Sequence, residues 1–217
     1  MIRIIIPTRN KVKELSITLN SIIDTANDIS NFEILLGVDY DDIETIEFVS
    51  KYNLNNIKVI YFNRQYYSNL HVYYNTLCKN AVGDLFWMFA DDCRILSKDW
   101  DLYLKKYENT FNYIKIKLLE SPWSTHFSLI PIIPKKWFEL TGRISEYSQI
   151  DGWLWGTAMN LNISVYDENV IVTNFVSANG DLHAHSYTNS NGDIFKNACD
   201  SPELKRDITL IKEYLKI

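Results

Sequence analysis

Two adjacent aspartates, Asp91 and Asp92, directly follow an apolar run over residues 85–90. A continuous apolar run of this kind is typical of a strand that is buried on both faces, as in a parallel sheet. In an open α/β sheet, ligands bind beyond the carboxyl ends of the strands. Two neighbouring carboxylates at such a place repel each other unless a positive charge lies beside them. A divalent cation that carries a phosphorylated ligand would supply this charge, although aspartates also begin ordinary turns.

The same pattern occurs earlier in the chain. The apolar segment 32–36 leads into an acidic turn that contains Asp39, Asp41 and Asp42. If both strands belong to one parallel sheet, their carboxyl ends lie at the same edge. We therefore expect the two acidic turns to form one acidic crevice.

Apolar spacing and turn signals divide the chain into alternating strands and helices. The first half is predicted to contain strands at 1–6, 32–39, 57–62 and 85–91, with helices after Asn10, near 43–49 and over 70–79. The second half is predicted to contain helices at 100–107, from 151 and from 202, and strands at 127–133 and 169–176. Pro131 predicts that the segment 127–133 is an edge strand or an irregular one. The alternation predicts an α/β fold, with a mostly parallel sheet flanked by helices, in a single domain over residues 1–217.

Composition limits the kind of protein that the chain can be. Hydrophobic residues make up 47% and charged residues 23% of the 217 residues, as in ordinary globular proteins. The formal charge of −5 and the lack of a Lys/Arg run argue against a nucleic-acid partner. The three cysteines have no CxxC spacing, which disfavours a zinc site or a disulfide framework. The sequence shows neither a signal peptide nor an apolar run of about 18 residues, so we expect a cytoplasmic protein without a membrane span.

The sequence has neither a GxGxxG nor a GxxxxGKS/T loop, so bound phosphates would need a metal held by acidic side chains. Residues 4–10 (IIIPTRN) resemble the opening segment of family 2 type glycosyltransferases with the GT-A fold. Residues 81–84 (AVGD), the strand after them and residues 90–92 (ADD) resemble that family's approach to its DxD-type metal motif. The resemblance covers about the first half of the chain. It implies a Rossmann-like GT-A domain with a nucleotide-binding half at 1–95 and an acceptor-binding half at 96–217.

Carried over residue by residue, the resemblance implies a nucleotide site at the ends of the first three strands. Thr8, Arg9 and Asn10 would line the pocket, Asp39 would accept a hydrogen bond from the uracil ring N–H, and Arg64 would pack on the base. An ordinary helix N-cap is the alternative role for the segment from Thr8 to Asn10, above all for Asn10.

The resemblance also implies a site for Mn²⁺ or Mg²⁺. Asp91 would face the ribose or the waters of the metal, and Asp92 would bind the metal itself. Ala90 stands at the first of three positions that are often acidic in the family, which leaves open which aspartate touches the metal. His183 and His185 resemble the late His that GT-A enzymes often bring to the metal, and on a strand both would point to one face. Imidazole suits Mn²⁺ better than Mg²⁺, and His185, which adjoins a Ser/Thr/Asn/Gly loop, is the preferred ligand.

Asp151 is the candidate catalytic residue. Residues 150–156 (IDGWLWG) resemble the family segment in which an aspartate precedes an aromatic-rich helix. A transfer with inversion needs a base that takes the proton of the acceptor hydroxyl while its oxygen attacks the anomeric carbon. A carboxylate beside Trp rings is partly desolvated, which raises its pKa and makes it a stronger base. A helix cap is the alternative role for Asp151, and Glu146 is the second candidate base.

The sequence therefore predicts a metal-dependent enzyme that moves a sugar from a UDP-sugar to a hydroxyl of a glycan or another acceptor, with inversion. Acceptor sugars are expected to stack on one or two of four tryptophans, Trp123, Trp137, Trp153 and Trp155. A nucleotidyltransferase shares the layered α/β plan, but it usually needs a Gly-rich loop after the first strand, where residues 7–10 contain no Gly. A non-catalytic sugar-nucleotide or carbohydrate binding protein would keep Asp39 but would have no need of Asp151.

Overall fold

An eight-stranded sheet forms the centre of the computed structural model, which describes residues 1–52, 56–119, 125–174 and 201–217. The strands are β1 (Ile2–Thr8), β2 (Phe32–Asp39), β3 (Ile57–Phe62), β4 (Leu85–Met88), β5 (Cys93–Ile95), β6 (Tyr113–Leu118), β7 (Ile132–Pro134) and β8 (Ser164–Asn174). They lie in the order β3-β2-β1-β4-β7-β6-β8-β5, so both halves of the sequence build one sheet. The fold is of the α/β class that the sequence predicts.

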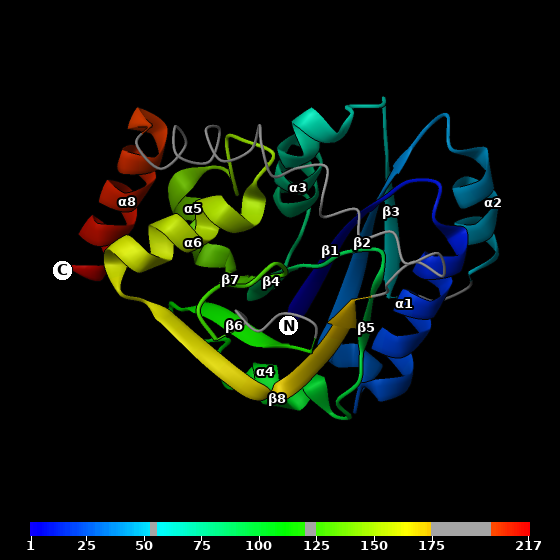
Figure 1. Cartoon of the computed structure of the whole chain (residues 1–217), viewed down its shortest axis with the longest axis horizontal. Helices are drawn as coiled ribbons and strands as arrows, with labels where there is room; N and C mark the ends of the chain where they lie inside the picture. The colour runs from blue at the N-terminus through cyan, green and yellow to red at the C-terminus, as the bar shows by residue number, and fades with distance from the viewer. Residues whose placement is uncertain (53–55, 120–124, 175–200) are drawn as a thin grey trace.

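Helices cover both faces of this sheet (Figure 1). The helices that pack on one face are α1 (Val12–Thr25), α2 (Ile43–Lys51) and α4 (Trp100–Lys105). The helices that pack on the other face are α3 (Leu70–Lys79), α5 (Lys135–Thr141), α6 (Ile150–Leu161) and α8 (Pro202–Leu215). Short 3₁₀ turns precede β2 and α3, at Ile29–Asn31 and Tyr67–Asn69.

The first half alternates strands and helices because its strands are buried on both faces. Ile2, Ile4 and Ile6 of β1 belong to the core under α1, α2 and α4, whereas Ile5 belongs to the core under α3, α5, α6 and α8. A strand with apolar contacts on both faces has a continuous apolar sequence, which is typical of parallel sheets with helical crossovers. Strands β3, β2, β1 and β4 pair in parallel, as predicted.

The second half departs from the parallel pattern. β7 runs antiparallel to both of its neighbours, β4 and β6, and β8 pairs with β6 in parallel and with β5 in antiparallel orientation. Figure 1 shows β8 as a long strand that extends from the end of α6 toward β5. The chain leaves the centre of the sheet after β4 and returns in β5 at the far edge.

Several sequence predictions need correction. The strand that was expected at 127–133 is only Ile132–Pro134, and it lies inside the sheet, so the edge position is wrong. Pro131 is tolerated because it precedes the strand, where its carbonyl accepts a hydrogen bond from the backbone N–H of Met88 at 2.9 Å. β4 ends at Met88 and does not continue to Asp91. The elements β5, β6 and α5 were not predicted.

In the described part of the chain, no helix combines the length and the apolar character that crossing a bilayer requires.

Candidate active site

The carboxyl ends of β2, β1 and β4 meet at one edge of the sheet and carry the predicted polar residues. β1 lies between β2 and β4, and its last residue, Thr8, pairs with Val38, which directly precedes Asp39. Asp91 and Asp92 lie in the turn that follows β4. The two acidic turns therefore lie at the same edge, as the sequence predicts.

Asp39 is buried, with 1% of its surface exposed, and its two carboxylate oxygens have different partners. The Tyr73 hydroxyl of α3 donates to Oδ1 at 2.5 Å, and Nη1 of Arg9 donates to Oδ2 at 2.9 Å. The Tyr73 hydroxyl accepts a hydrogen bond from the backbone N–H of Gln65 at 3.0 Å. Burial and then the Asp39 hydrogen bond raise the pKa of Tyr73 to about 12, so the phenol keeps its proton. Since a carboxylate offers about four acceptor sites, Asp39 retains the capacity to bind a further donor.

Arg9 and Asn10 are both bound to the acidic turn after β2. Arg9 pairs with Asp41 in addition to Asp39. Asn10 has a φ of 54°, and its backbone N–H donates to Asp42 at 2.8 Å. The N-cap of α1 is Lys11, so the alternative that Asn10 caps this helix is wrong.

Arg64 lies on the loop after β3, at the same edge. It is exposed, and its guanidinium carbon is 4.4 Å from the centroid of the Tyr66 ring, which gives a cation–π contact. The pKa of Asp41 is lowered mainly by the hydrogen bond from Arg9, and Arg64 adds a smaller effect in the same direction. Arg64 is therefore near the acidic turn and contacts the face of the Tyr66 ring.

Lys11 lies beside both aspartates that follow β4. Its Nζ is 3.2 Å from Oδ1 of Asp91 and 2.7 Å from Oδ2 of Asp92. Burial raises the pKa of Asp91 to about 6, the charge of Lys11 opposes this shift, and the charge of Asp92 adds to it. The positive charge that the sequence predicts beside the pair is, in this structure, a lysine.

One buried donor at this edge has no partner. Arg9 Nε makes no hydrogen bond to any of the residues that the structure describes. Buried polar atoms are nearly always hydrogen-bonded in native proteins, and an unpaired donor costs free energy. Arg9 directly follows β1, between the acidic turns that come after β2 and β4.

Asp151 lies in the first turn of α6. The N-cap of this helix is Gln149, so the alternative that Asp151 is the cap is wrong. Its Oδ1 accepts a hydrogen bond from the backbone N–H of Gly152 at 2.9 Å. Burial raises the pKa of Asp151 to about 6, and the backbone hydrogen bonds from Gly152 and from its own N–H oppose the shift. The residue as a whole is of intermediate exposure.

Tyr74 of α3 lies near both the sheet edge and Asp151. Its hydroxyl donates to the carbonyl of Phe89, two residues before Asp91, at 3.0 Å. Burial raises the pKa of Tyr74 well above its ordinary value, and the negative charges of Asp91 and Asp151 raise it further. Both carboxylates are thus within electrostatic range of one buried phenol, so the candidate base and the acidic pair lie around the same part of the molecule.

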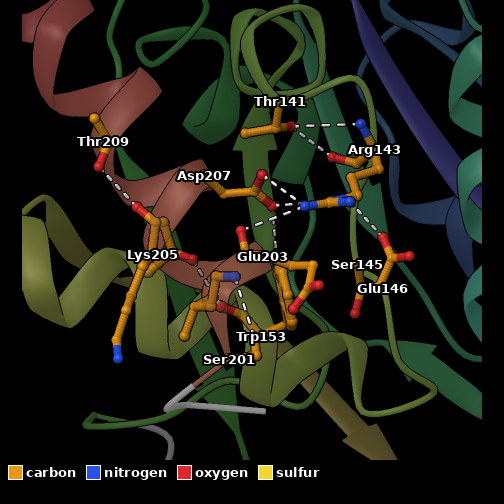
Figure 2. Close-up of polar contacts among 12 residues, drawn as sticks. Thr141, Arg143, Ser145, Glu146, Trp153, Ser201, Glu203, Lys205, Asp207 and Thr209 are labelled. Carbon is orange, nitrogen blue, oxygen red and sulfur yellow. Dashed lines mark hydrogen bonds and ion pairs between the residues drawn. The ribbon is translucent and has the colours of Figure 1, made fainter.

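Glu146, the second candidate base, belongs to a different network. Figure 2 shows Arg143 between Glu146 and Asp207 of α8. Glu146 is paired with Arg143, and 45% of its side chain is exposed. Arg143 donates to Asp207 through Nε at 3.2 Å and through Nη2 at 3.1 Å, and Trp153 Nε1 donates to the same carboxylate at 3.2 Å. To act as a base, Glu146 would have to leave this ion pair.

The predicted sugar-stacking tryptophans differ in how far they are buried. Trp137 is fully buried and stacks on Phe111 with 5.9 Å between ring centroids, and Trp153 is 2% exposed. Both serve the core and offer no face to a sugar. Trp155 is partly exposed, and its Nε1 donates to the carbonyl of His126 at 2.9 Å.

Three predictions concern residues outside the described ranges: Trp123, His183 and His185. Within the described ranges, no group of three His, Cys, Asp or Glu side chains could hold a metal ion. This part of the chain therefore offers the carboxylates of Asp91 and Asp92, and further ligands would come from a bound phosphate or from residues outside it.

Sequence reasoning missed two residues of the site, Lys11 and Tyr73. Lys11 directly follows the segment Thr8–Asn10, and its position between that segment and a helix was the only signal for it. Tyr73 lies on the predicted helix 70–79, but nothing in its spacing relates it to Asp39, because the two residues come together only through the packing of α3 on β2.

We expect the Asp151 carboxyl group to titrate near pH 6, about two units above an ordinary aspartate. The measurement is the ¹³Cγ chemical shift of Asp151 as a function of pH. The pKa of Asp91 is also raised to about 6, so the Asp151 signal is assigned by its loss in Asp151→Asn. A midpoint near pH 4 would show that burial does not perturb this group.

Comparison with known proteins identifies the family. Residues 3–142 match the sequence profile of Glycosyl transferase family 2. Mannosyltransferase PcManGT from Pyrobaculum calidifontis, solved in complex with GDP-Man and Mn²⁺, superposes with a TM-score of 0.68 and 13% identity over 96% of this chain and 69% of its own. S. aureus TarS 1–349 in complex with UDP-GlcNAc superposes with a TM-score of 0.68 and 18% identity over 99% of this chain and 71% of its own. None of the curated proteins matches the sequence.

The solved structures and the family profile support different conclusions. At 13% and 18% identity, the two solved structures show the fold alone, which is the GT-A fold that the sequence predicts. The profile match covers well over half of the 217 residues and includes the ends of β1, β2 and β4. The chain therefore belongs to glycosyl transferase family 2.

Proposed function

We propose that this protein is a metal-dependent glycosyltransferase that moves a sugar from a UDP-sugar to an acceptor hydroxyl with inversion. The observation that carries the proposal is the edge of the sheet in a family 2 chain, which bears Asp39, Asp91 and Asp92. Asp91 and Asp151 both raise the pKa of the buried Tyr74 beside this edge. Residues 1–95 would hold the nucleotide and residues 96–217 the acceptor, which is a glycan or another hydroxyl compound.

The nucleotide base would be recognised by Asp39. A carboxylate accepts from a ring N–H, which uracil and guanine possess, whereas cytosine and adenine have an unprotonated ring nitrogen at the corresponding position. The solved relatives hold GDP-Man in one case and UDP-GlcNAc in the other. Because Tyr73 and Arg9 hold both oxygens of Asp39 in place, the acceptor geometry exists before the donor binds. Arg64 would then pack on the base, and Thr8, Arg9 and Asn10 would line the rest of the pocket.

The residues present fit a divalent cation with oxygen ligands. Asp92 would hold Mn²⁺ or Mg²⁺, Asp91 would face the ribose or the waters of the ion, and His185 or His183 would be a further ligand. When bound, the ion would neutralise the charge of the departing diphosphate. The unpaired Arg9 Nε would contribute a hydrogen bond to the nucleotide-sugar at the same edge.

Asp151 would act on the acceptor. Its carboxylate takes the hydroxyl proton while the acceptor oxygen forms a bond to the anomeric carbon, and the bond from that carbon to the diphosphate oxygen breaks with its electron pair on the diphosphate. With a pKa of about 6, Asp151 is charged and competent above pH 6 and becomes protonated below it. The rate of transfer should therefore fall as the pH decreases through about 6.

We expect UDP binding to depend on the metal through Asp92. Calorimetric titration of UDP should give at least about tenfold higher affinity with Mn²⁺ than with a chelator, which is within the usual range for coupled sites. Asp92→Asn should abolish this difference, because the amide no longer neutralises the cation.

Asp24→Asn is the matched control, since Asp24 is an exposed carboxylate on α1. It should keep the full dependence of UDP affinity on Mn²⁺. Equal UDP affinity of the unmodified protein with Mn²⁺ and with chelator would refute the metal-dependent part of the proposal.

A further inference from the structure

The ammonium group of Lys11 is the cation that neutralises the acidic pair in this structure. It contacts one oxygen of each aspartate, at 3.2 Å for Asp91 and 2.7 Å for Asp92. A lysine ammonium is positively charged at neutral pH, because the ordinary pKa of a lysine is about 10. The aspartates therefore carry a counter-ion of their own before any metal arrives.

This counter-ion competes with a metal for the same oxygen. Asp92, the predicted metal ligand, gives its Oδ2 to Lys11. A divalent cation on that carboxylate would also be repelled by the ammonium, because like charges at contact distance disfavour each other in a partly buried site. The ammonium must leave the pair before the cation can bind well.

The Lys11 side chain has room to move away from the two aspartates. Its side chain is 40% exposed, and a lysine ammonium is a compact charge on a flexible stem of four carbons. The residue is the N-cap of α1, directly after the segment that would line the nucleotide pocket. A diphosphate bound beside Thr8 and Arg9 would offer the displaced ammonium a new set of anionic oxygens.

We propose that Lys11 is a place-holding counter-cation that the divalent metal displaces and that the donor's diphosphate then binds. The proposal rests on the proposed function, since it requires a metal and a diphosphate at this edge. It makes the two binding events cooperative. Without the diphosphate, the metal displaces the Lys11 ammonium from the aspartates, and the ammonium finds no other anion. With the diphosphate bound, the displaced ammonium pairs with the phosphate oxygens, so the metal binds more tightly.

The test measures Mn²⁺ binding and needs no turnover. Bound Mn²⁺ is determined by electron paramagnetic resonance for the unmodified protein, Lys11→Met and Lys11→Arg, each with and without UDP. Lys13→Met is the matched control, because Lys13 lies two residues after Lys11, is exposed and carries the same charge. Circular dichroism verifies that each variant is folded.

Without UDP, Lys11→Met should bind Mn²⁺ about tenfold more tightly than the unmodified protein, and UDP should strengthen its Mn²⁺ binding by a correspondingly smaller factor. Lys11→Arg and Lys13→Met should both resemble the unmodified protein. Equal Mn²⁺ affinity of Lys11→Met and the unmodified protein would overturn the role of Lys11 and leave the proposed function standing. If no variant binds Mn²⁺ even with UDP, the metal-dependent function fails, and the role of Lys11 fails with it.

Discussion

Sugar transfer should slow by about 10²–10⁴-fold when Asp151 is replaced by Asn, because a general base of this kind contributes about that factor to the rate. The substitution preserves the size of the side chain and keeps a side-chain oxygen that can accept the hydrogen bond from the Gly152 backbone N–H. Affinity for the UDP-sugar should stay close to that of the unmodified protein, because a base acts on the acceptor in the transition state and not on the bound donor. The loss should therefore appear in kcat, with little change in the donor KM.

The measurement compares initial rates and donor affinities of Asp151→Asn, Glu146→Gln and the control Asp24→Asn. Glu146 is held in an ion pair with Arg143, so its substitution should change the rate far less than that of Asp151. Full activity of Asp151→Asn would indicate that Glu146 is the base or that the mechanism is retaining. The anomeric configuration of the product distinguishes these two possibilities. An unmodified protein that binds UDP-sugars but transfers none would be a binding protein.

The sequence predicts the parallel half of the fold well because that half obeys simple rules. β1, β2 and β4 are buried on both faces, and such strands have apolar runs that no surface element shares. The acidic turns at their ends are then placed by topology alone, since parallel strands deliver their last residues to one edge. For this reason Asp39, Asp91 and Asp92 could be assigned to one edge without a structure.

The second half was harder to predict because its determinants are tertiary. β6 alternates apolar residues with lysines, which normally indicates a solvent-exposed face, yet Lys115 is buried. Its ammonium is accommodated by the carbonyl of Thr125, at 2.7 Å, which no local pattern could predict. The contact of Lys11 with the acidic pair is of the same kind, because it joins residues 80 positions apart.

The network in Figure 2 connects the last helix to the helix that carries Asp151. Asp207 is 1% exposed on α8, and it accepts hydrogen bonds from Arg143 and from Trp153, which lies two residues after Asp151 in α6. Arg143 also donates to the backbone carbonyl of Glu203 at 3.3 Å. A single carboxylate thus holds together α8, α6 and the loop between α5 and α6.

Asp207→Ala should lower the free energy of unfolding by about 1–3 kcal/mol, because the Arg143 donors to Asp207 lose their buried acceptor and Arg143 keeps, among the described residues, only Glu146 as an ion-pair partner. The Trp153 N–H loses its acceptor as well, which adds to the cost. The measurement is urea denaturation followed by far-ultraviolet circular dichroism. Glu213→Ala is the matched control on α8, since its side chain is exposed, and its effect should stay within about 0.5 kcal/mol.

A double variant separates the loss of the ion pair from a loss of packing. In Arg143→Met/Asp207→Leu both charges are replaced by apolar side chains, and such exchanges of buried pairs are often neutral or stabilising. The double variant should therefore recover much of the stability that Asp207→Ala loses. If Asp207→Ala costs less than about 1 kcal/mol, or if the double variant is no more stable than Asp207→Ala, then the buried pair of Asp207 and Arg143 does not explain how α8 is held against α6.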